Sequence, residues 1–420
     1  MLGCDPGSSA FLLSQSTQSV SRTTVAGVDS PSRGHSVTYA AAAFAVASQL
    51  FTNVYPVFVG ALASSGRATP AQLGRLATVE YLCMALAAMF AGKILPLTRL
   101  RSVAVIASLI EIAAVVATTY VSGDELLPVR AIFAGACGVH VWIQYEFVAR
   151  SHNPGRLVGL CTTVVVIAAV LMSWLASSYV VPAFGVDGVI LFFGLPSFVA
   201  ILGALMLPRT VAAVPTHPQT NAAPKQSGFS SGSLWLLASA GAWSAWINVL
   251  WVYSEPLSRA LGMSETTSQA FVVASLISSL AGAGLGALMA ERLPSGAVLT
   301  AGLTICMAQV IAFLLGVGST AYVIWFCPFG FVGYFLVPFF VKALAAADSS
   351  RQSVVFFPTA QYSGASLGPL IASFVVSPGQ YRGGLLVDLG CIAVAIGALW
   401  IDLFYRRVSR GSTALEPPAA

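Results

Sequence analysis

The sequence has few charged residues for its length. Asp, Glu, Lys and Arg make up 8% of the 420 residues, whereas soluble domains carry roughly 25%. So few charges cannot cover the surface of a soluble protein of this size, because soluble surfaces are rich in charged side chains. This excludes a soluble enzyme, a nucleic-acid-binding protein and a disordered chain.

Cysteine and histidine motifs are also missing. None of the seven cysteines forms a C-x-x-C pair, and six of them lie in apolar runs, where they behave as small hydrophobes. The four histidines show no metal-ligand spacing, and no G-x-x-x-x-G-K-[ST] phosphate loop occurs. We therefore expect no cofactor, no metal site and no ATP-driven pump. A membrane-embedded enzyme would need clustered His, Asp or Glu, and no such cluster occurs in the sequence.

Long apolar segments make up most of the chain, and 57% of its residues are hydrophobic. A membrane-spanning helix needs ~20 mostly apolar residues, so the composition supplies about 12 spans. The predicted segments are 37–63, 72–95, 102–121, 127–149, 157–182 and 187–207, followed by 233–258, 267–290, 296–317, 319–345, 353–376 and 383–405. The expected fold is an all-α integral membrane protein with about 12 transmembrane helices in two pseudo-symmetric six-helix bundles.

Polar stretches divide the chain into domains. Residues 1–36 are rich in Ser, Thr, Gly and Gln, and we predict a disordered cytoplasmic N-terminal tail there. The N-terminal bundle covers 37–207, a polar cytoplasmic linker 208–232, the C-terminal bundle 233–405, and a cytoplasmic C-terminal tail 406–420.

Basic residues predict the orientation, because Lys and Arg are retained on the cytoplasmic side. Fifteen of the 20 lie in both tails and in the loops on the same side, four lie on the opposite side, and Arg130 lies within a span. Both termini are thus predicted to be cytoplasmic, in a plasma or inner membrane.

The two halves show a weak internal repeat. An offset of 195 residues aligns Phe51-Thr-Asn53-Val54 with Trp246-Ile-Asn248-Val249, and Arg156 with Arg351. Many transporters are built from such repeats, with the substrate site near the membrane midplane between them.

With these features the chain resembles the major facilitator superfamily of transporters, over residues 37–405. The family signature after the second span is G-x-x-x-D-[RK]-x-G-[RK]-[RK], and this region reads Gly92-Lys-Ile-Leu-Pro96-Leu-Thr-Arg99-Leu-Arg101. The glycine and basic residues are present, but Pro96 replaces the acid that helps to latch the halves. The second copy, Ala287-Leu-Met-Ala-Glu291-Arg292, keeps the acid and the arginine and loses the glycine.

Two further family motifs bear on the subfamily. Arg130-Ala-Ile-Phe-Ala-Gly135 matches the family's arginine early in the fourth span, with the glycine one residue late. The drug-antiporter signature of the fifth span is absent, although Gly364-Ala-Ser-Leu-Gly368-Pro369 echoes it in the eleventh. The resemblance implies a monomeric carrier with a central substrate site that opens alternately to either side.

Charged residues within the spans are candidates for function, because a charge at the membrane centre costs at least ~2.5–3.5 kcal/mol. They are Glu80, Glu111, Arg130, Glu255 and Asp388. For Glu111 and Asp388, which fall on spans that are peripheral in the family fold, we expect local pairing or capping. Glu146 and Asp402 lie near span ends and are expected at the membrane interface.

Arg130 and Glu80 support two interpretations. Arg130 either binds an anionic group or tunes a proton-carrying Glu80, since its planar fork suits a carboxylate. Alternatively the two form a fixed ion pair that holds the second and fourth spans together. Glu80 has no charged counterpart in the second half, where the offset gives Ser275, which favours a dedicated role in proton coupling. Glu255 is a second proton-coupling candidate.

Polar residues form matching stripes in the first and seventh spans. Gln49 and Asn53 share one helix face, and Ser244, Asn248 and Trp251 share another. The functional interpretation is substrate binding from both halves. The alternative is polar contacts between helices, worth only ~0.6 kcal/mol each on average.

The fourth span adds Gln144, close to the face of Arg130, and His140. We include Gln144 among the substrate-binding candidates and interpret His140 as a packing residue or, less favoured, a proton relay. The seventh and tenth spans are crowded with aromatic residues, which favours a substrate with an apolar or aromatic body.

The sequence thus predicts a secondary active transporter of a small organic molecule, aromatic or anionic in character and proton-coupled, which is not an enzyme. The expected partners are the substrate, protons and the lipid bilayer, and no nucleic acid. The alternative is a transporter-derived sensor or scaffold that binds without translocating.

Overall fold

The structure, a computed structural model, describes residues 31–207, 231–316, 318–376 and 381–413, and every regular element within these ranges is helical. The N-terminal half contains α1 (Pro31–Ser64), α2 (Pro70–Ile94), α3 (Leu100–Thr118), α4 (Leu126–Arg150), α5 (Pro154–Leu175), α6 (Val181–Phe192) and α7 (Leu195–Met206). The C-terminal half contains α8 (Ser231–Ala260), α9 (Glu265–Met289), α10 (Ser295–Leu314), α11 (Ser319–Ala347), α12 (Gln352–Ser373) and α13 (Arg382–Thr413).

Each predicted apolar segment coincides with one helix or, for the sixth, with the α6–α7 pair. By length and composition alone, eight stretches of the described residues are able to cross a membrane, or nine if the bent α1 is one span. One of these stretches, Pro154–Met206, contains α5, α6 and α7. The predicted class, an all-α multi-pass membrane protein, is confirmed.

Local sequence signals explain where several helices begin. Thr69 caps α2 in a reciprocal capping box with Gln72, and Pro70 occupies the first turn, where its missing N–H is harmless. Ser264, the repeat equivalent of Thr69, caps α9 by accepting a hydrogen bond from the backbone N–H of Thr267. The repeat therefore extends to the helix caps.

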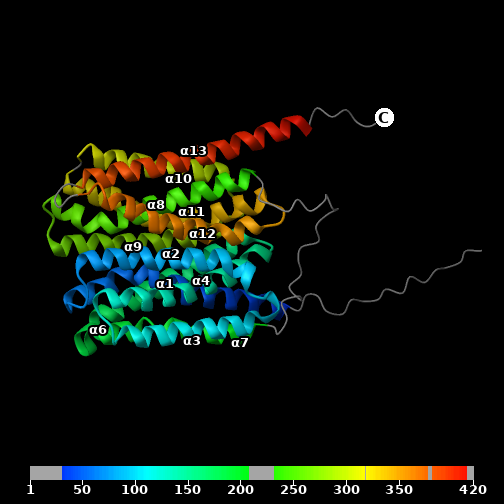
Figure 1. Ribbon diagram of the computed structural model, residues 1–420. Coiled ribbons are helices and arrows are strands. Elements are labelled where there is room, and N and C mark those ends of the chain that lie inside the picture. The colour runs from blue at the N-terminus through cyan, green and yellow to red at the C-terminus, as the bar shows by residue number, and fades with distance from the viewer. Residues whose placement is uncertain (1–30, 208–230, 317, 377–380, 414–420) are drawn as a thin grey trace, which may run out of the picture.

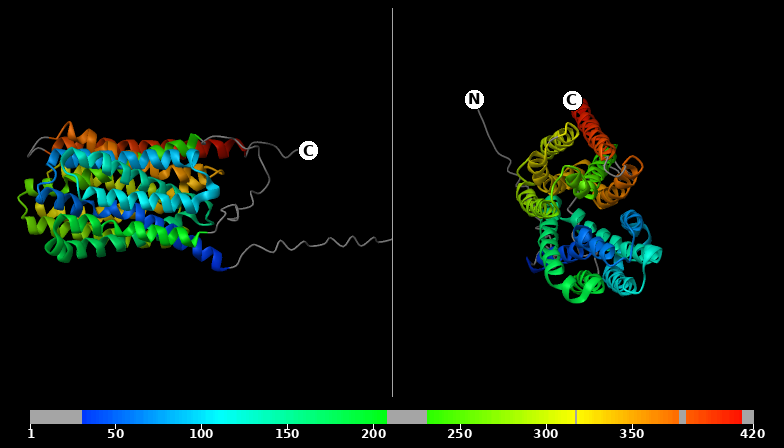
Figure 2. Two further views of the ribbon diagram at one scale, coloured as in Figure 1. Left: turned by 60° about the horizontal axis from the view of Figure 1, so that its bottom comes forward. Right: turned by 90° about the vertical axis from the view of Figure 1, so that its left-hand side faces the viewer.

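The helices form two bundles that lie side by side (Figure 1). An end-on view separates the blue-to-green N-terminal half from the green-to-red C-terminal half (Figure 2). Equivalent helices pack in equivalent pairs: α1 with α5 and α8 with α12, α2 with α4 and α9 with α11, α3 with α7 and α10 with α13. Three-dimensional pairing thus follows the internal repeat of the sequence.

The halves meet through α2 with α12, α5 with α9 and α11, and α4 with α12. Small residues allow this close approach. A Cβ atom added at Gly159 would lie 2.7 Å from Cα of Ala287, and one added at Gly155 would lie 2.7 Å from the carbonyl oxygen of Pro338. Larger side chains at either glycine would push the halves apart.

Some boundaries differ from the prediction. α1 begins at Pro31, within the range assigned to the tail, and α13 continues to Thr413. The sixth span is not one regular helix, because Gly185 adopts a φ of 61° inside α6 and Gly194 separates α6 from α7. Residues 1–30, most of the linker and residues 414–420 lie outside the described residues.

Candidate functional site

A cavity of about 140 Å³ lies between the two halves, lined by residues from both. A cavity of roughly 150 Å³ accommodates a benzene ring, so the space suits a small molecule with a single ring. In the N-terminal half the lining comes from Gln49, Thr52, Asn53, Tyr81, Tyr145, Thr162 and Val165. In the C-terminal half it comes from Trp243, Ser244, Ile247, Asn248, Trp251, Ser275, Leu276, Ser279, Phe329, Gly330, Gly333, Tyr334, Val337, Gln361, Tyr362 and Ala365.

The polar stripe of α1 faces this cavity, as its spacing predicted. Asn53 Nδ2 donates to the carbonyl oxygen of Gln49 at 2.8 Å. Gln49 Nε2 donates to Oε1 of Gln144 at 2.6 Å. Gln144 is buried and does not itself line the cavity, so it orients Gln49 from behind. Gln144 was also predicted to bind substrate, but of the two glutamines only Gln49 lines the cavity.

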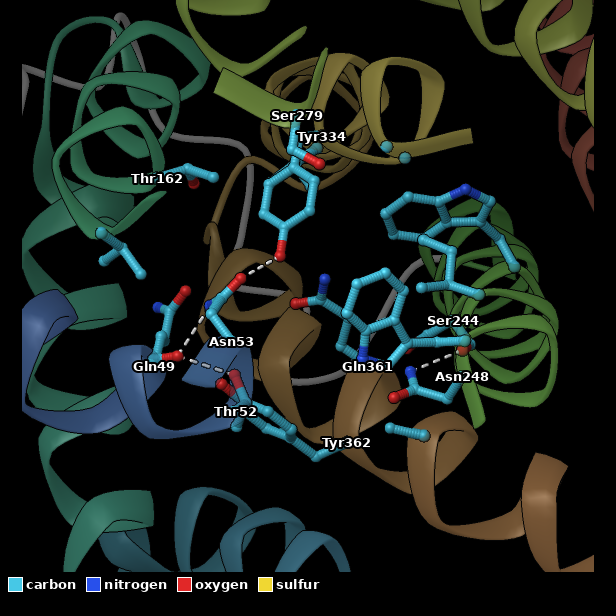
Figure 3. A pocket seen from close by; sticks show the side chains of 18 of the residues that line it. Gln49, Thr52, Asn53, Thr162, Ser244, Asn248, Ser279, Tyr334, Gln361 and Tyr362 are labelled. Carbon is cyan, nitrogen blue, oxygen red and sulfur yellow. Dashed lines mark hydrogen bonds between the residues drawn. The ribbon is translucent and has the colours of Figure 1, made fainter. Parts of the chain in front are cut away.

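The matching stripe of α8 faces the cavity from the other half. Asn248 Nδ2 donates to the carbonyl oxygen of Ser244 at 2.9 Å, leaving its side-chain oxygen free to accept. Trp251 lies one turn along and also lines the cavity. The repeat-equivalent residues Asn53 and Asn248 therefore project into one space, with Gln361 between them in the view of Figure 3.

One hydrogen bond joins the halves across the cavity. The hydroxyl of Tyr334 on α11 donates to Oδ1 of Asn53 on α1 (Figure 3). Both residues line the cavity, so a ligand with its own donors and acceptors competes for the same atoms.

Aromatic rings supply flat surfaces at two places on the wall. The rings of Trp251 and Phe329 stack with centroids 6.3 Å apart and an interplanar angle of 13°. Tyr81 of the first half stacks on Tyr362 of the second at 6.2 Å and 15°. Aromatic faces contact the apolar face of a ring while amides and hydroxyls bind its edge groups.

Charged side chains do not line the cavity anywhere in the described chain: the lining contains amides, hydroxyls, phenols and indoles, but no Asp, Glu, Lys, Arg or His. Nor do the described residues contain a group of three His, Cys, Asp or Glu able to hold a metal ion. The described lining can therefore make neutral hydrogen bonds and ring contacts, and it contains no counter-charge for an ion.

Arg130 and Glu80 form a buried ion pair between α4 and α2, through Arg130 Nε and Glu80 Oε1. The side chains are 2% and 4% exposed, and neither lines the cavity. Three phenylalanine rings surround the guanidinium: Phe51 at 4.2 Å, Phe58 at 4.8 Å and Phe133 at 4.0 Å from ring centroid to Cζ. Arg130, a predicted substrate-binding residue, therefore contacts Glu80 and three rings instead of the described cavity lining.

A second buried pair joins α3 and α4. Nδ1 of His140 lies 2.8 Å from Oε1 of Glu111, and its Nε2 lies 3.1 Å from the carbonyl oxygen of Ala104. Phe44 stacks on the imidazole at 5.6 Å. Both residues are fully buried and lie away from the cavity lining, in the local pairing expected for Glu111.

The remaining charged candidates behave differently from one another. Asp388 is 1% exposed, and its Oδ1 has no hydrogen-bond partner among the described residues, so the expected local pairing is not seen. Asp402, expected at the membrane interface, is buried and pairs with Arg406 at 2.8 Å. Glu146 pairs with Arg150 at 2.8 Å. The side chain of Glu255 lies outside the described part of the chain.

Several cavity residues were not identified as site residues from the sequence. Tyr81, Tyr145, Gln361 and Tyr362 belong to neither of the two polar stripes that the repeat identifies in the first and seventh spans. Tyr334 belongs to the aromatic cluster of the tenth span, but the sequence does not say which of those rings faces inward. Only the packing of α2, α4, α11 and α12 brings them together.

Comparison with known proteins supports the fold. No protein-family model matches the sequence, and no curated protein matches it significantly. Among solved structures, the transporter FucP of the major facilitator superfamily, in its outward conformation, matches with a TM-score of 0.64 and 15% identity over 88% of this chain and 98% of that chain. The E. coli fucose:proton symporter FucP, in another structure, matches with a TM-score of 0.64 and 14% identity over the same shares. The human organic anion transporter MFSD10 matches with a TM-score of 0.63 and 13% identity over 89% and 99%. The chain therefore has the fold of major facilitator superfamily transporters.

Proposed function

We propose that this protein is a secondary active transporter of a small uncharged molecule, driven by protons and working by alternating access. The observation that carries the proposal is the cavity between the halves, where repeat-equivalent amides, Asn53 and Asn248, project from the two bundles into one space. A site shared between two bundles changes shape whenever they move relative to each other. Such movement couples binding to exposure on either side of the membrane.

The chemistry of the lining favours an uncharged substrate with several hydroxyl or amide groups and a ring. A buried ion without a counter-charge is costly, and the described lining provides none. Arg130, the cation expected to bind an anion, is already held by Glu80 and three phenylalanine rings. The similar structures include a fucose symporter and an organic anion transporter. The uncharged cavity supports a substrate closer to the sugar than to the anion.

Proton coupling is assigned to Glu80. It is buried beside Arg130, and it lies next in sequence to Tyr81, which lines the cavity. The pKa of a buried carboxyl depends on desolvation and on the nearby cation, so Glu80 would titrate as its contact with Arg130 opens and closes. Protonation would release Arg130 and loosen α2 from α4, close to the cavity wall.

Two contacts between the halves lie on opposite sides of the cavity along α12. At the start of α12, Arg351 Nη1 donates to the carbonyl oxygens of Ala149 and Ser151, at 2.9 and 2.5 Å, at the end of α4. Beyond the cavity-lining part of α12, the hydroxyl of Ser366 donates to the carbonyl oxygen of Thr78 at 3.1 Å. In an alternating-access cycle these contacts would break in turn.

Membrane orientation follows the basic residues: we assign the chain ends and the linker to the cytoplasm. Cysteine labelling tests this in a cysteine-free background, with one cysteine at Ser227 in the linker or at Ser122 between α3 and α4. Impermeant reagent should label the second position and not the first in intact cells. Equal labelling of both would contradict the orientation.

Counterflow in proteoliposomes tests the transport function and the substrate class together. Purified protein is loaded with an unlabelled compound and given the same compound labelled outside, using a panel of neutral monosaccharides and a matched panel of aromatic carboxylates. We expect transient accumulation with members of the first panel only. Accumulation with the carboxylates alone would contradict the uncharged site, and saturable binding without counterflow would favour the sensor.

A further inference from the structure

Two tyrosines separate the cavity from the buried ion pair. Tyr81 lines the cavity, and its ring lies 6.2 Å from that of Tyr55 between centroids. Tyr55 does not line the cavity and packs on its other side against Phe51 and Phe58, two of the rings around Arg130. Glu80 is thus one aromatic layer away from the space where the substrate would bind.

Tyr55 and Glu80 belong to one buried cluster around Arg130: Tyr55 packs against Phe51 and Phe58, whose rings flank the guanidinium that pairs with Glu80. Oη of Tyr55 and Oε2 of Glu80 are both buried, and neither makes a well-formed hydrogen bond to any described residue. Buried polar groups rarely lack a partner, and each exception calls for an explanation. These two unpartnered atoms come from α1 and α2 in the same buried cluster, one able to donate and the other to accept.

The other groups around Glu80 are less suited to moving a proton. Arg130 on α4 has only donors and no acceptor. Cys83 on α2 and Cys137 on α4 carry thiols, which are weak donors and acceptors. Tyr81 is directed to the cavity and stacks on Tyr362 of the other half. Tyr55 is therefore the group of this cluster best able both to donate and to accept.

We propose that Tyr55 passes protons between the cavity and Glu80, an inference that rests on the assignment of Glu80 as proton carrier. The Tyr55 hydroxyl gives its proton to Oε2 of Glu80 while its oxygen takes one from a hydrated proton that enters from the cavity past the edge of Tyr81. Tyr55 ends unchanged, Glu80 ends neutral, and Arg130 keeps its charge. Release follows the same steps in reverse.

This route also relates proton transfer to substrate occupancy. The ring of Tyr81 is held on one side by Tyr55 and on the other by Tyr362, and both Tyr81 and Tyr362 line the cavity. A substrate ring that contacts this pair shifts Tyr81 and changes the access of water to Tyr55. Substrate in the cavity would therefore control whether a proton can reach Tyr55.

Time-resolved infrared spectroscopy after a pH jump tests the relay without any substrate. The full-length protein in lipid vesicles is compared with Glu80→Gln, which identifies the carboxylic-acid C=O band of Glu80 by its loss. In Tyr55→Phe the ring remains and the hydroxyl is gone. We expect the band to reach its normal final amplitude at a rate lower by roughly a hundredfold, the low end of the effect of a positioned proton donor.

Two further variants separate the relay from packing. Tyr322→Phe removes a buried tyrosine hydroxyl that donates to the carbonyl oxygen of Ser254 at 3.0 Å, away from the cavity, and should leave the rate unchanged. Tyr55→His restores a group that donates and accepts, and should recover most of the rate. Equal slowing in Tyr55→Phe and Tyr55→His would mean that the residue acts through packing.

The outcomes distinguish the relay from the proposed coupling. If Glu80→Gln removes the band and Tyr55→Phe protonates at the wild-type rate, Glu80 remains the carrier and the relay is wrong. If Glu80→Gln leaves the spectrum unchanged, Glu80 does not titrate, and both the coupling and the relay are overturned.

Discussion

The two halves share one architecture but differ in what their equivalent positions contain. Glu80 and Arg130, a buried ion pair in the first half, correspond by the repeat offset to Ser275 and Trp325 in the second. Ser275 lines the cavity, and Trp325 is 37% exposed on α11. The second buried pair, Glu111 with His140, corresponds to Cys306 and Phe335. Charge inside the first bundle is therefore not a requirement of the fold.

The comparison separates scaffold from function. Features present in both halves, such as the helix pairings, the caps at Thr69 and Ser264 and the amides Asn53 and Asn248, follow from the duplicated bundle and its shared site. A feature confined to one half has to be explained by a task that only that half performs. For the Glu80–Arg130 pair we propose proton coupling. The following changes test this division.

The largest expected effect is on stability, from removing one member of the buried pair. Arg130→Met leaves Glu80 buried without its partner, which should cost about 3–5 kcal/mol of unfolding free energy. The measurement is thermal or denaturant unfolding of purified protein in detergent. Arg130→Lys should recover only part of the loss, because an ammonium cannot reproduce the fork.

Trp325→Leu is the matched change in the other half and should cost far less, since that side chain is partly exposed. The double variant Arg130→Met with Glu80→Leu should regain much of the lost stability, because no unpaired charge remains. If both single variants lost similar amounts of unfolding free energy, the buried Glu80–Arg130 pair would contribute no more to stability than the equivalent position in the second half.

Transport should separate into two parts in Glu80→Gln, which keeps the shape of the side chain and removes its titration. Uphill accumulation driven by a pH gradient should vanish, so that the ratio of inside to outside substrate falls to about one, since no proton is carried. Exchange of substrate for substrate should continue, because it needs no net proton movement. Wild-type accumulation in this variant would assign Glu80 a structural role and direct the search to Asp388, Glu255 or His140.

Binding should weaken in both halves by similar amounts when the shared amides are truncated. Asn53→Ala and Asn248→Ala should each cost about 1–2 kcal/mol of binding free energy, the scale of a lost hydrogen bond. Binding is measured by calorimetry or by counterflow half-saturation with whichever neutral compound the panel identifies. Loss of stability with unchanged affinity in both variants would show that the amides hold helices together.

The smallest expected effect comes from an exposed ion pair in the same half. Arg75 lies 2.8 Å from Asp124, but the side chains are 56% and 63% exposed. Arg75→Ala should change the unfolding free energy by no more than about 1 kcal/mol, because exposed pairs gain little in water. If Arg75→Ala lowered the unfolding free energy as much as Arg130→Met, burial would not explain how much each ion pair of the first half contributes to stability.

Sequence reasoning reached part of the site because helical spacing is a local property. Gln49 and Asn53, like Ser244, Asn248 and Trp251, recur at intervals that place them on one face of a helix, and all five line the cavity. It did not show which way Arg130 points, because α4 is surrounded by other helices and its sequence has no single polar face to indicate direction. It also left Tyr334 undistinguished among its aromatic neighbours.

Composition and pattern by themselves determined the fold class, the positions of the apolar segments and the division into two similar halves. These follow from the length of apolar helix that a membrane requires and from the internal repeat of the sequence. Only the tertiary structure decided that Arg130 is held by Glu80 and three phenylalanines, that Tyr334 bonds to Asn53 across the halves, and that no described charge faces the cavity. The reason is that these contacts join residues far apart in the chain, and the face that a buried helix turns toward each neighbour is set by the packing of all of them together.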